Sequence, residues 1–275
     1  MLRIEKRIPK VDWGQEFNRH WNGNNPPATH AFNALSFIFP QGEQFFIDAA
    51  KEVAQNTDFS QNQALEEEVK LFIAQEATHG NQHVKYNTCL EDSGYENVVY
   101  NVVEYFIKSA HRYLSPLTKL AFVCAYEHYT AILGDFVLSK PQVLKEAEPR
   151  MALVWGWHAA EETEHKSVSF DLYEAAGGGW IRRILAFLLV TIQLAYLFCR
   201  LFWSMLYRDG SLKFSRLPKT ISQFMSFFFG KDGVNWYLLK YSFHYFSPQF
   251  HPWNRDNRLL LQTWLDQNNF QLQII

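Results

Sequence analysis

The sequence has few of the features that mark secreted or polyanion-binding proteins. Its three cysteines, Cys89, Cys124 and Cys199, form no CxxC pair, which argues against a disulfide framework and against a thiolate metal site. The 26 basic and 28 acidic residues give a net charge of −2, so no general field attracts nucleic acid. The first residues, MLRIEKRIPKVDWG, contain no apolar secretory core. We therefore expect a cytoplasmic protein that binds no nucleic acid.

What the chain has in excess is apolar side chains and a local group of histidines. Of its 275 residues, 48% are hydrophobic and 17% aromatic, with 24 phenylalanines, so a sizeable buried core is expected. Six of the ten histidines fall between His79 and His165. No alternating β-branched pattern competes with the helical spacing of the apolar residues in this part of the chain. The sequence therefore predicts an all-α protein.

The apolar spacing predicts helices over residues 29–55, 60–90, 97–111, 115–138 and 141–176, with Pro40 and Gly42 interrupting the first. Three consecutive glycines, 177–179, would end the last of these helices. Further helices are expected over 215–246, around a turn at 230–233, and over 254–269. The predicted organisation is an N-terminal arm over 1–28, a helical bundle over 29–176 and a hydrophobic, aromatic-rich helical extension over 177–275 that packs on the bundle.

Ionisable residues occupy positions on these helices where apolar residues are expected. In chain order they are Glu43, the pair Glu76 and His79, Glu127, and the pair Glu162 and His165. A Glu and a His three residues apart lie on one helix face, so both can bind the same metal ion. Two such pairs, with one further Glu from each of two other helices, are the ligand set of a di-metal site in a four-helix bundle. The two halves of this set are spaced alike, because Glu76 lies 33 positions after Glu43 and Glu162 lies 35 positions after Glu127.

These acids share their helix faces with apolar side chains, so a solvated face explains them poorly. Glu76 and His79 follow Leu65, Val69 and Phe72 at helical spacing. A carboxylate on an apolar stripe is costly unless it is paired or bound to metal. We therefore predict a metal centre, with catalysis at the metals held by the four glutamates. Glu161 and Glu164 point away from this stripe, and we expect them to be solvated or to pair with another helix.

His158 lies four residues before Glu162 and seven before His165, and therefore on the same stripe. This HxxxExxH motif resembles the extended ligand motif of the p-aminobenzoate N-oxygenase branch of ferritin-like di-iron proteins, where a third histidine joins the ligands. The resemblance implies a ferritin-like bundle with seven ligands, namely Glu43, Glu76, His79, Glu127, His158, Glu162 and His165. His83, one turn beyond His79, is expected to support a ligand from behind, with an eighth ligand as the alternative.

Longer segments carry a second resemblance. FPQGEQFF, FIAQEATHGNQH, AYEHYTAILG and WGWHAAEETEHKSVSFDLY are similar to a bacterial family described as predicted metal-dependent hydrolase. The similarity extends from about Ala31 to Tyr173 and implies that two metals activate water for hydrolysis.

Mixed carboxylate and imidazole ligands suit two iron ions, with manganese as the alternative. Iron in such a bundle activates O₂, so we favour an oxygenase or oxidase that also needs an electron donor. By analogy with the N-oxygenase, His158 would add a neutral donor to one iron. Three other hypotheses remain: the metal-dependent hydrolase, a metal-storage or ferroxidase protein, and a membrane-docked binding protein with a structural metal.

Two aromatic-rich features bear on the substrate and on the membrane. Phenylalanines near the proposed site either line an apolar channel for an acyl chain or aromatic molecule, or pack as ordinary core; they are Phe37, Phe39, Phe45, Phe46, Phe72, Phe106 and Phe122. Residues 184–207 form an apolar run with basic flanks, of which residues 184–199 carry no charge. Because a span needs about 20 residues, we expect burial against the bundle, or peripheral contact with the inner membrane, instead of a span.

Overall fold

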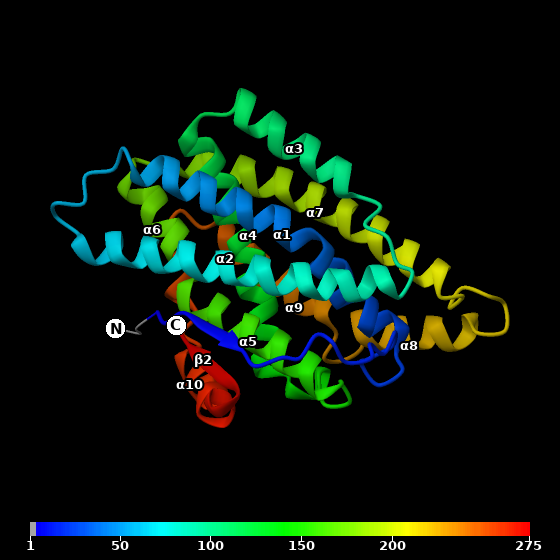
Figure 1. Cartoon of the computed structure of the whole chain (residues 1–275). Helices are drawn as coiled ribbons and strands as arrows, with labels where there is room; N and C mark the ends of the chain where they lie inside the picture. Colours follow the sequence, from blue (N-terminus) through cyan, green and yellow to red (C-terminus); the bar gives the residue numbers. More distant parts are fainter. Residues whose placement is uncertain (1–3) are drawn as a thin grey trace.

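The chain folds almost entirely into helices (Figure 1). The computed structural model describes residues 4–275, with α1 (Pro26–Ala54), α2 (Gln63–Asp92), α3 (Tyr100–Tyr113), α4 (Pro116–Ser139), α5 (Pro149–His165), α6 (Val168–Ala175), α7 (Trp180–Arg208), α8 (Leu217–Phe229), α9 (Val234–Ser242) and α10 (Arg258–Asn268). Short 3-10 helices occupy Pro141–Val143, Phe243–Phe246, Pro252–Asn254 and Asn269–Gln271. Within residues 4–275 the two strands are β1 (Arg7–Pro9) and β2 (Leu272–Ile274), which pair antiparallel. The predicted all-α fold class is confirmed.

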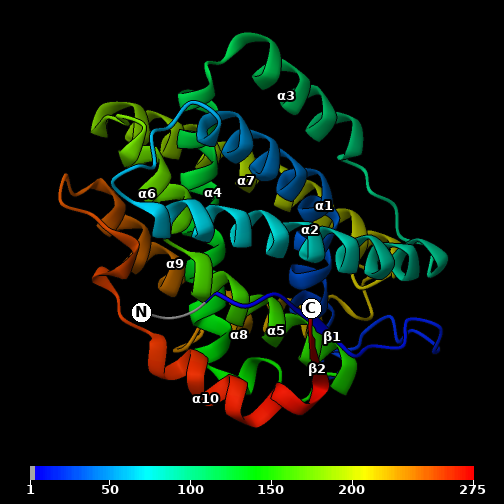
Figure 2. The ribbon, with the colours of Figure 1, turned by 60° about the vertical axis from the view of Figure 1, so that its left-hand side comes forward.

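Four of these helices, α1, α2, α4 and α5, carry the predicted ligands. α1 packs along α2 and α4, and α4 packs against α5. Both ribbon views show α1 and α2 side by side (Figure 1 and Figure 2). The stripe of α2 predicted to be apolar is buried, with Leu65, Val69, Phe72, Tyr86 and Leu90 each at most 3% exposed. The helical period of the sequence therefore turns the ligand-bearing faces inward.

The interruption predicted at Pro40 is wrong, because α1 continues through Pro40 and Gly42 to Ala54. A proline inside a helix removes one backbone hydrogen bond. Buried side chains on both sides of it, among them Phe37 and Phe45, fix the segment against the bundle. Tertiary packing of this kind supplies most helical stability in proteins, and here it outweighs the local cost.

The N-terminal arm lies against α2 and α5 through β1, and β1 pairs with the C-terminal strand β2 (Figure 2). The arm ends earlier than predicted. The Asn25 side chain accepts a hydrogen bond from the Ala28 N–H, and Pro26 and Pro27 occupy the first helical positions, where a missing N–H costs little. α1 therefore begins at Pro26. Residues 1–3 of the predicted arm lie outside the described range.

The single helix predicted over 141–176 is also wrong, because the segment divides into a 3-10 turn, α5 and α6. The Glu148 N–H donates to the Trp21 carbonyl at 2.8 Å, which ties the start of α5 to the arm. At the other end, the Lys166 ammonium donates to the Arg255 carbonyl and to Asn257 Oδ1 at 2.7 and 2.8 Å. Contacts with distant segments thus end α5 directly after His165.

α7 is a continuous helix of 29 residues, longer than the charge-free run indicated. It is the one helix in the described range that is long and apolar enough to cross a membrane by length and composition, with a mean hydropathy of 2.1 in its most apolar window. Only 28% of that window is buried. One face packs against α1 and α4 while the other is exposed, so the prediction of burial is correct for one face only.

The remaining helices of the extension cover other sides of the bundle. α8 and α9 pack against α1 and α4 respectively, and α10 packs against α5. The turn predicted around residues 230–233 separates α8 from α9, and the last predicted helix corresponds to α10. Gly177, with φ of +79°, follows α6, as the glycine triplet predicted.

Gly134 controls how closely α4 and α5 approach, and its replacement should destabilise the bundle. A Cβ at this position would lie 3.0 Å from the Ala159 carbonyl oxygen, whereas a Cβ at Gly42 would meet nothing within 4 Å. We expect Gly134→Ala to lower the free energy of unfolding by about 1–3 kcal/mol through overpacking. The matched Gly42→Ala should raise it by roughly 0.5–1 kcal/mol through helix propensity. Urea denaturation measures both, and equal effects at the two positions would contradict this packing.

Candidate metal centre

The structure brings all seven predicted ligands into one buried cluster in the bundle. They are Glu43 from α1, Glu76 and His79 from α2, Glu127 from α4, and His158, Glu162 and His165 from α5, each at most 4% exposed. The four helices meet with these faces turned inward. A cluster of seven ionisable side chains without solvent contact is costly unless their charges are compensated locally.

One half of the cluster is centred on His165. Its Nε2 lies 3.1 Å from Glu76 Oε1, 3.4 Å from Glu127 Oε2 and 3.4 Å from Glu162 Oε2. The oxygens come from three different helices. Glu76, Glu127 and His165 each offer an atom within 4.8 Å of the other two, which is close enough for one ion to contact all three.

The other half is centred on His79 and His158. Glu162 Oε1 lies 3.0 Å from His158 Nε2 and 3.5 Å from His79 Nδ1, and Glu76 Oε1 lies 3.8 Å from His79 Nδ1. Glu43 lies within the same 4.8 Å limit of Glu76 and His79. Glu76 and Glu162 each approach histidines of both halves. Glu43 and Glu127 each belong to one half.

The inner polar atoms of this cluster lack hydrogen-bond partners. The oxygens without a partner are both of those on Glu43, Glu76 and Glu127, and Oε2 of Glu162. The nitrogens without a partner are His79 Nδ1, His158 Nε2 and His165 Nε2. Buried polar atoms in folded proteins are nearly always hydrogen-bonded, so a concentration of exceptions needs an explanation. Oxygen and imidazole nitrogen atoms that face one another without protons to share are suitable donors to divalent cations. The residues present therefore fit bound metal.

A hydrogen bond at Nδ1, the outer nitrogen of His165, determines which ring nitrogen carries the proton and which faces the cluster with a lone pair. The Gln75 amide donates to the Glu5 carbonyl and to Glu164 Oε2, both at 3.0 Å, so its Oε1 must be the acceptor toward His165. His165 Nδ1 therefore donates to Gln75 Oε1 at 2.9 Å. A neutral imidazole with its proton on Nδ1 presents the lone pair of Nε2 to the cluster.

A longer chain of hydrogen bonds determines which ring nitrogen of His158 carries the proton. The Asn87 amide donates to the Ser36 carbonyl, so Asn87 Oδ1 accepts from the Ser36 hydroxyl at 2.7 Å. The Ser36 oxygen can then accept from His83 Nδ1 at 2.9 Å, and His83 Nε2 accepts from His158 Nδ1 at 2.9 Å. His158 is left with a lone pair on Nε2, directed at the cluster. His83 thus lies behind a candidate ligand. It also offers an atom within 4.8 Å of Glu43 and His158, so the alternative of an eighth ligand stays open.

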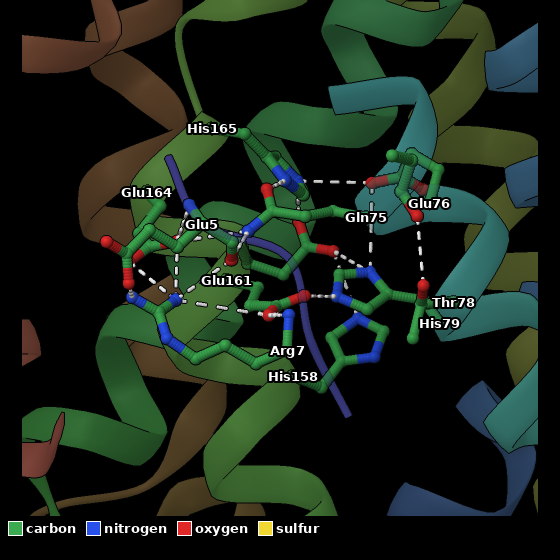
Figure 3. Close-up of polar contacts among 12 residues, drawn as sticks. Glu5, Arg7, Gln75, Glu76, Thr78, His79, His158, Glu161, Glu164 and His165 are labelled. Atoms are coloured by element: carbon green, nitrogen blue, oxygen red, sulfur yellow. Dashed lines mark hydrogen bonds and ion pairs between the residues drawn. The ribbon is translucent and has the colours of Figure 1, made fainter. Parts of the chain in front are cut away.

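The partner of His79 is Glu161, which the sequence did not identify. His79 Nε2 contacts Glu161 Oε2 at 3.1 Å, and a carboxylate acceptor there leaves the Nδ1 lone pair facing inward (Figure 3). Glu161 and Glu164 are at most 4% exposed, so the solvated alternative is wrong and pairing with another segment is correct. Both point away from the metal stripe, but the arm covers that side of α5.

Arg7 of the arm holds these two acids in place (Figure 3). Its guanidinium lies 2.8 Å from Glu164 Oε1, and its backbone N–H donates to Glu161 Oε1 at 3.0 Å. Burial raises the pKa of both carboxyls, that of Glu161 to about 8, and Arg7 limits the rise. No local pattern around Arg7 marks it as part of the site, because its position depends on how the arm folds back.

Burial also sets the charge of the cluster itself. It raises the pKa of Glu43, Glu76 and Glu127 well above the usual range, and repulsion by the neighbouring carboxylates adds to this. Burial would raise the pKa of Glu162 as well, but His165 and His158 hold it below the usual range. The pKa of His158 falls to about 4, mainly because burial disfavours the imidazolium. Cations that bind here must therefore displace protons from the carboxyls.

Two apolar cavities reach the cluster. The first, of about 380 Å³, includes His158 and Glu162 in its wall, and the second, of about 330 Å³, includes Glu43. They share the wall residues Leu35, Phe39, Tyr129, Thr130, Leu133 and Leu194. Volumes of this size are typical of sites for small organic ligands.

Both interpretations of the phenylalanines apply, to different residues. Phe39, Phe45, Phe46, Phe106 and Phe122 line the cavities. Phe37 and Phe72 are packed in the core. The Phe39 ring also stacks on the His158 ring, with centroids 4.8 Å apart, so an apolar wall directly contacts a candidate ligand.

Removal of the carboxylate behind His79 should weaken metal binding without removing a ligand. We expect Glu161→Ala to reduce the affinity for Mn²⁺ by about 10–100-fold, because His79 would no longer be oriented and polarised. The control is Glu174→Ala, since Glu174 is exposed on α6. Competition with a chromophoric chelator measures the affinity. Equal Mn²⁺ affinities in the two variants would show that Glu161 does not support the site.

Comparison with known proteins agrees with a metal-dependent role. No curated protein and no solved structure matches the chain. A family model described as predicted metal-dependent hydrolase matches residues 5–256, a range that includes the arm, the bundle and most of the extension. The chain belongs to this predicted metal-dependent hydrolase family.

Proposed function

We propose that this protein is a ferritin-like, non-haem di-iron oxygenase or oxidase that acts on a hydrophobic small molecule. The observation that carries the proposal is the orientation of His79, His158 and His165. Three separate outer networks leave each ring with a lone pair directed at the same group of carboxylates. Metal-binding histidines characteristically show this arrangement.

The donor set favours iron, with manganese as the alternative. Glu43 and Glu127 from two helices, and an ExxH pair from each of α2 and α5, match the ligand pattern of di-iron and di-manganese carboxylate bundles. Structural zinc sites are usually tetrahedral and catalytic ones keep about three protein ligands, whereas the seven donors of this cluster would support higher coordination. Four ionised glutamates would also balance two divalent cations.

When bound, a pair of iron ions supplies redox chemistry with O₂. The chain's own contribution is to position an apolar substrate and to exclude water. The two cavities bring such a molecule to Glu43, Glu162 and His158 along aromatic walls. If one oxygen atom enters the substrate and the other leaves as water, two electrons must come from a separate donor. We therefore include an electron-donor partner in the proposal.

Hydrolysis is the second candidate, and the description of the family favours it. Two metals that activate water would suffice for the attacking step. Cleavage also requires a group that protonates the leaving atom. Hydroxyl groups close to Glu127 in sequence lie along the described cavity walls, namely those of Tyr126, Tyr129 and Thr130. A tyrosine hydroxyl can act as a general acid, so the hydrolytic candidate would draw its proton from Tyr126 or Tyr129.

Uptake of O₂ distinguishes the two candidates. Protein loaded with Fe²⁺ under anaerobic conditions and then exposed to O₂ should consume it in proportion to the bound iron. Glu127→Ala should lose most of this uptake, and Glu174→Ala should keep it. An oxygen electrode gives the measurement, and mass spectrometry of any co-purified molecule identifies the substrate. Absence of O₂ uptake, together with cleavage of an aryl ester by the zinc-loaded chain, would replace this proposal with the hydrolase.

A further inference from the structure

The outward face of α7 is unusually apolar for a surface in contact with water. Large apolar residues there are 44–77% exposed at helical spacing, namely Trp180, Ile181, Leu185, Leu188, Leu189, Ile192, Tyr196, Trp203 and Tyr207. Contiguous exposed apolar surface of this extent marks a site of protein or membrane interaction. At Trp203 the stripe continues onto α8, because its ring lies 5.7 Å from Phe224, and the α8 residues Ile221 and Met225 are also exposed.

α7 cannot use this face to cross a bilayer while the bundle is intact. Its opposite face is buried along most of its length, from Arg183 and Phe187 near the start to Leu206 near the end. That face packs on α1 and α4, so the helix lies along the bundle (Figure 1). A helix with one face held by protein and an apolar outer face can lie in the plane of a membrane interface.

The charges carried by α7, α8 and the turn between them are predominantly basic, although one of them, Arg208, pairs with Glu96. From Trp180 to Gly230 the chain contains seven basic residues and one acidic residue, Asp209. The Asp209 carboxylate is already paired, because His20 and His30 both contact its Oδ2 at 2.7 Å. The exposed basic residues include Arg182, Arg200, Lys213, Arg216 and Lys219. Such residues attract anionic lipid headgroups, whereas a symmetric contact with a second copy would set like charges against one another.

The larger cavity opens on the same face. Its wall runs from the buried candidate ligands His158 and Glu162 to Cys199 and Trp203, which are exposed on α7. Aromatic side chains of α7 and α8, including Phe198, Phe224 and Phe228, line the part between. A molecule dissolved in a membrane could therefore reach the cluster along an apolar path.

We propose that α7 and α8 dock this protein on the surface of an anionic lipid bilayer, with the mouth of the larger cavity facing the lipid. The stripe from Ile181 to Tyr207 enters the boundary between headgroups and acyl chains, and the flanking arginines and lysines contact the headgroups. The substrate is then a lipid-soluble molecule taken from the bilayer. This last step rests on the proposed function, whereas the docking does not.

Flotation of the full chain with vesicles tests the docking. We expect binding to vesicles of phosphatidylcholine mixed with phosphatidylglycerol, and weaker binding to phosphatidylcholine alone. Leu185→Glu and Ile192→Glu, separately and together, should weaken binding on the order of tenfold or more, because each places a charge where an apolar side chain enters the lipid. The matched control is Leu259→Glu, since Leu259 is 79% exposed on α10. Lys213→Glu combined with Arg216→Glu should remove the preference for anionic vesicles.

The outcomes separate docking from metal chemistry and from self-association. Glu127→Ala should bind vesicles like the unaltered chain, so a failure of O₂ uptake does not affect this test. Thermal unfolding confirms that the surface variants are folded. Wild-type chain that stays unbound to both kinds of vesicle would overturn the proposal. So would a lipid-free dimer, seen by light scattering, that Ile192→Glu dissociates, because the face would then bind a second copy.

Discussion

Burial of seven ionisable side chains in an apolar bundle is the constraint around which this structure is organised. Four carboxylates and three imidazoles are each at most 4% exposed, and their inner atoms lack hydrogen-bond partners. Such an arrangement is expensive in a chain without bound cations, because each charge is desolvated and the carboxylates repel one another. Two divalent cations would compensate all four negative charges at once. The same burial that makes the site costly also creates the dry, low-dielectric surroundings in which metal chemistry proceeds without competing water.

The hydrogen bonds that support this cluster reach segments far from it in the sequence, including the N-terminal arm and β2. Each histidine requires a fixed tautomer, and each is fixed from a different direction: by Glu161, by Gln75, and by the relay through His83 and Ser36. Glu161 and Glu164 are themselves buried acids, and Arg7 pairs with them from the arm. The arm in turn is held by its pairing with β2 at the end of the chain. The two termini therefore contribute to a site in the middle of the bundle through one continuous set of hydrogen bonds and ion pairs.

The sequence predicted the ligand-bearing helices and their inward faces, because helical period places Glu76 with His79, and Glu162 with His165, on faces that are otherwise apolar. It did not predict Arg7 or the role of Glu161, since both depend on an arm whose path is set by tertiary contacts. The error at Pro40 has the same origin: local propensity indicates a break, and packing on both sides of the proline outweighs it. The interruption of α5 after His165 depends on Lys166 contacts with residues about ninety positions away, which no local pattern contains.

Metal content is the most direct test of the proposed di-metal site. Chains loaded with Fe²⁺ under anaerobic conditions and freed of excess metal should retain about two ions each by elemental analysis, as a bundle with this ligand pattern does. Glu127→Ala should retain about one, because Glu127 contacts only the half of the cluster around His165. Retention of both ions by that variant, or of none by the unaltered chain, would contradict the site.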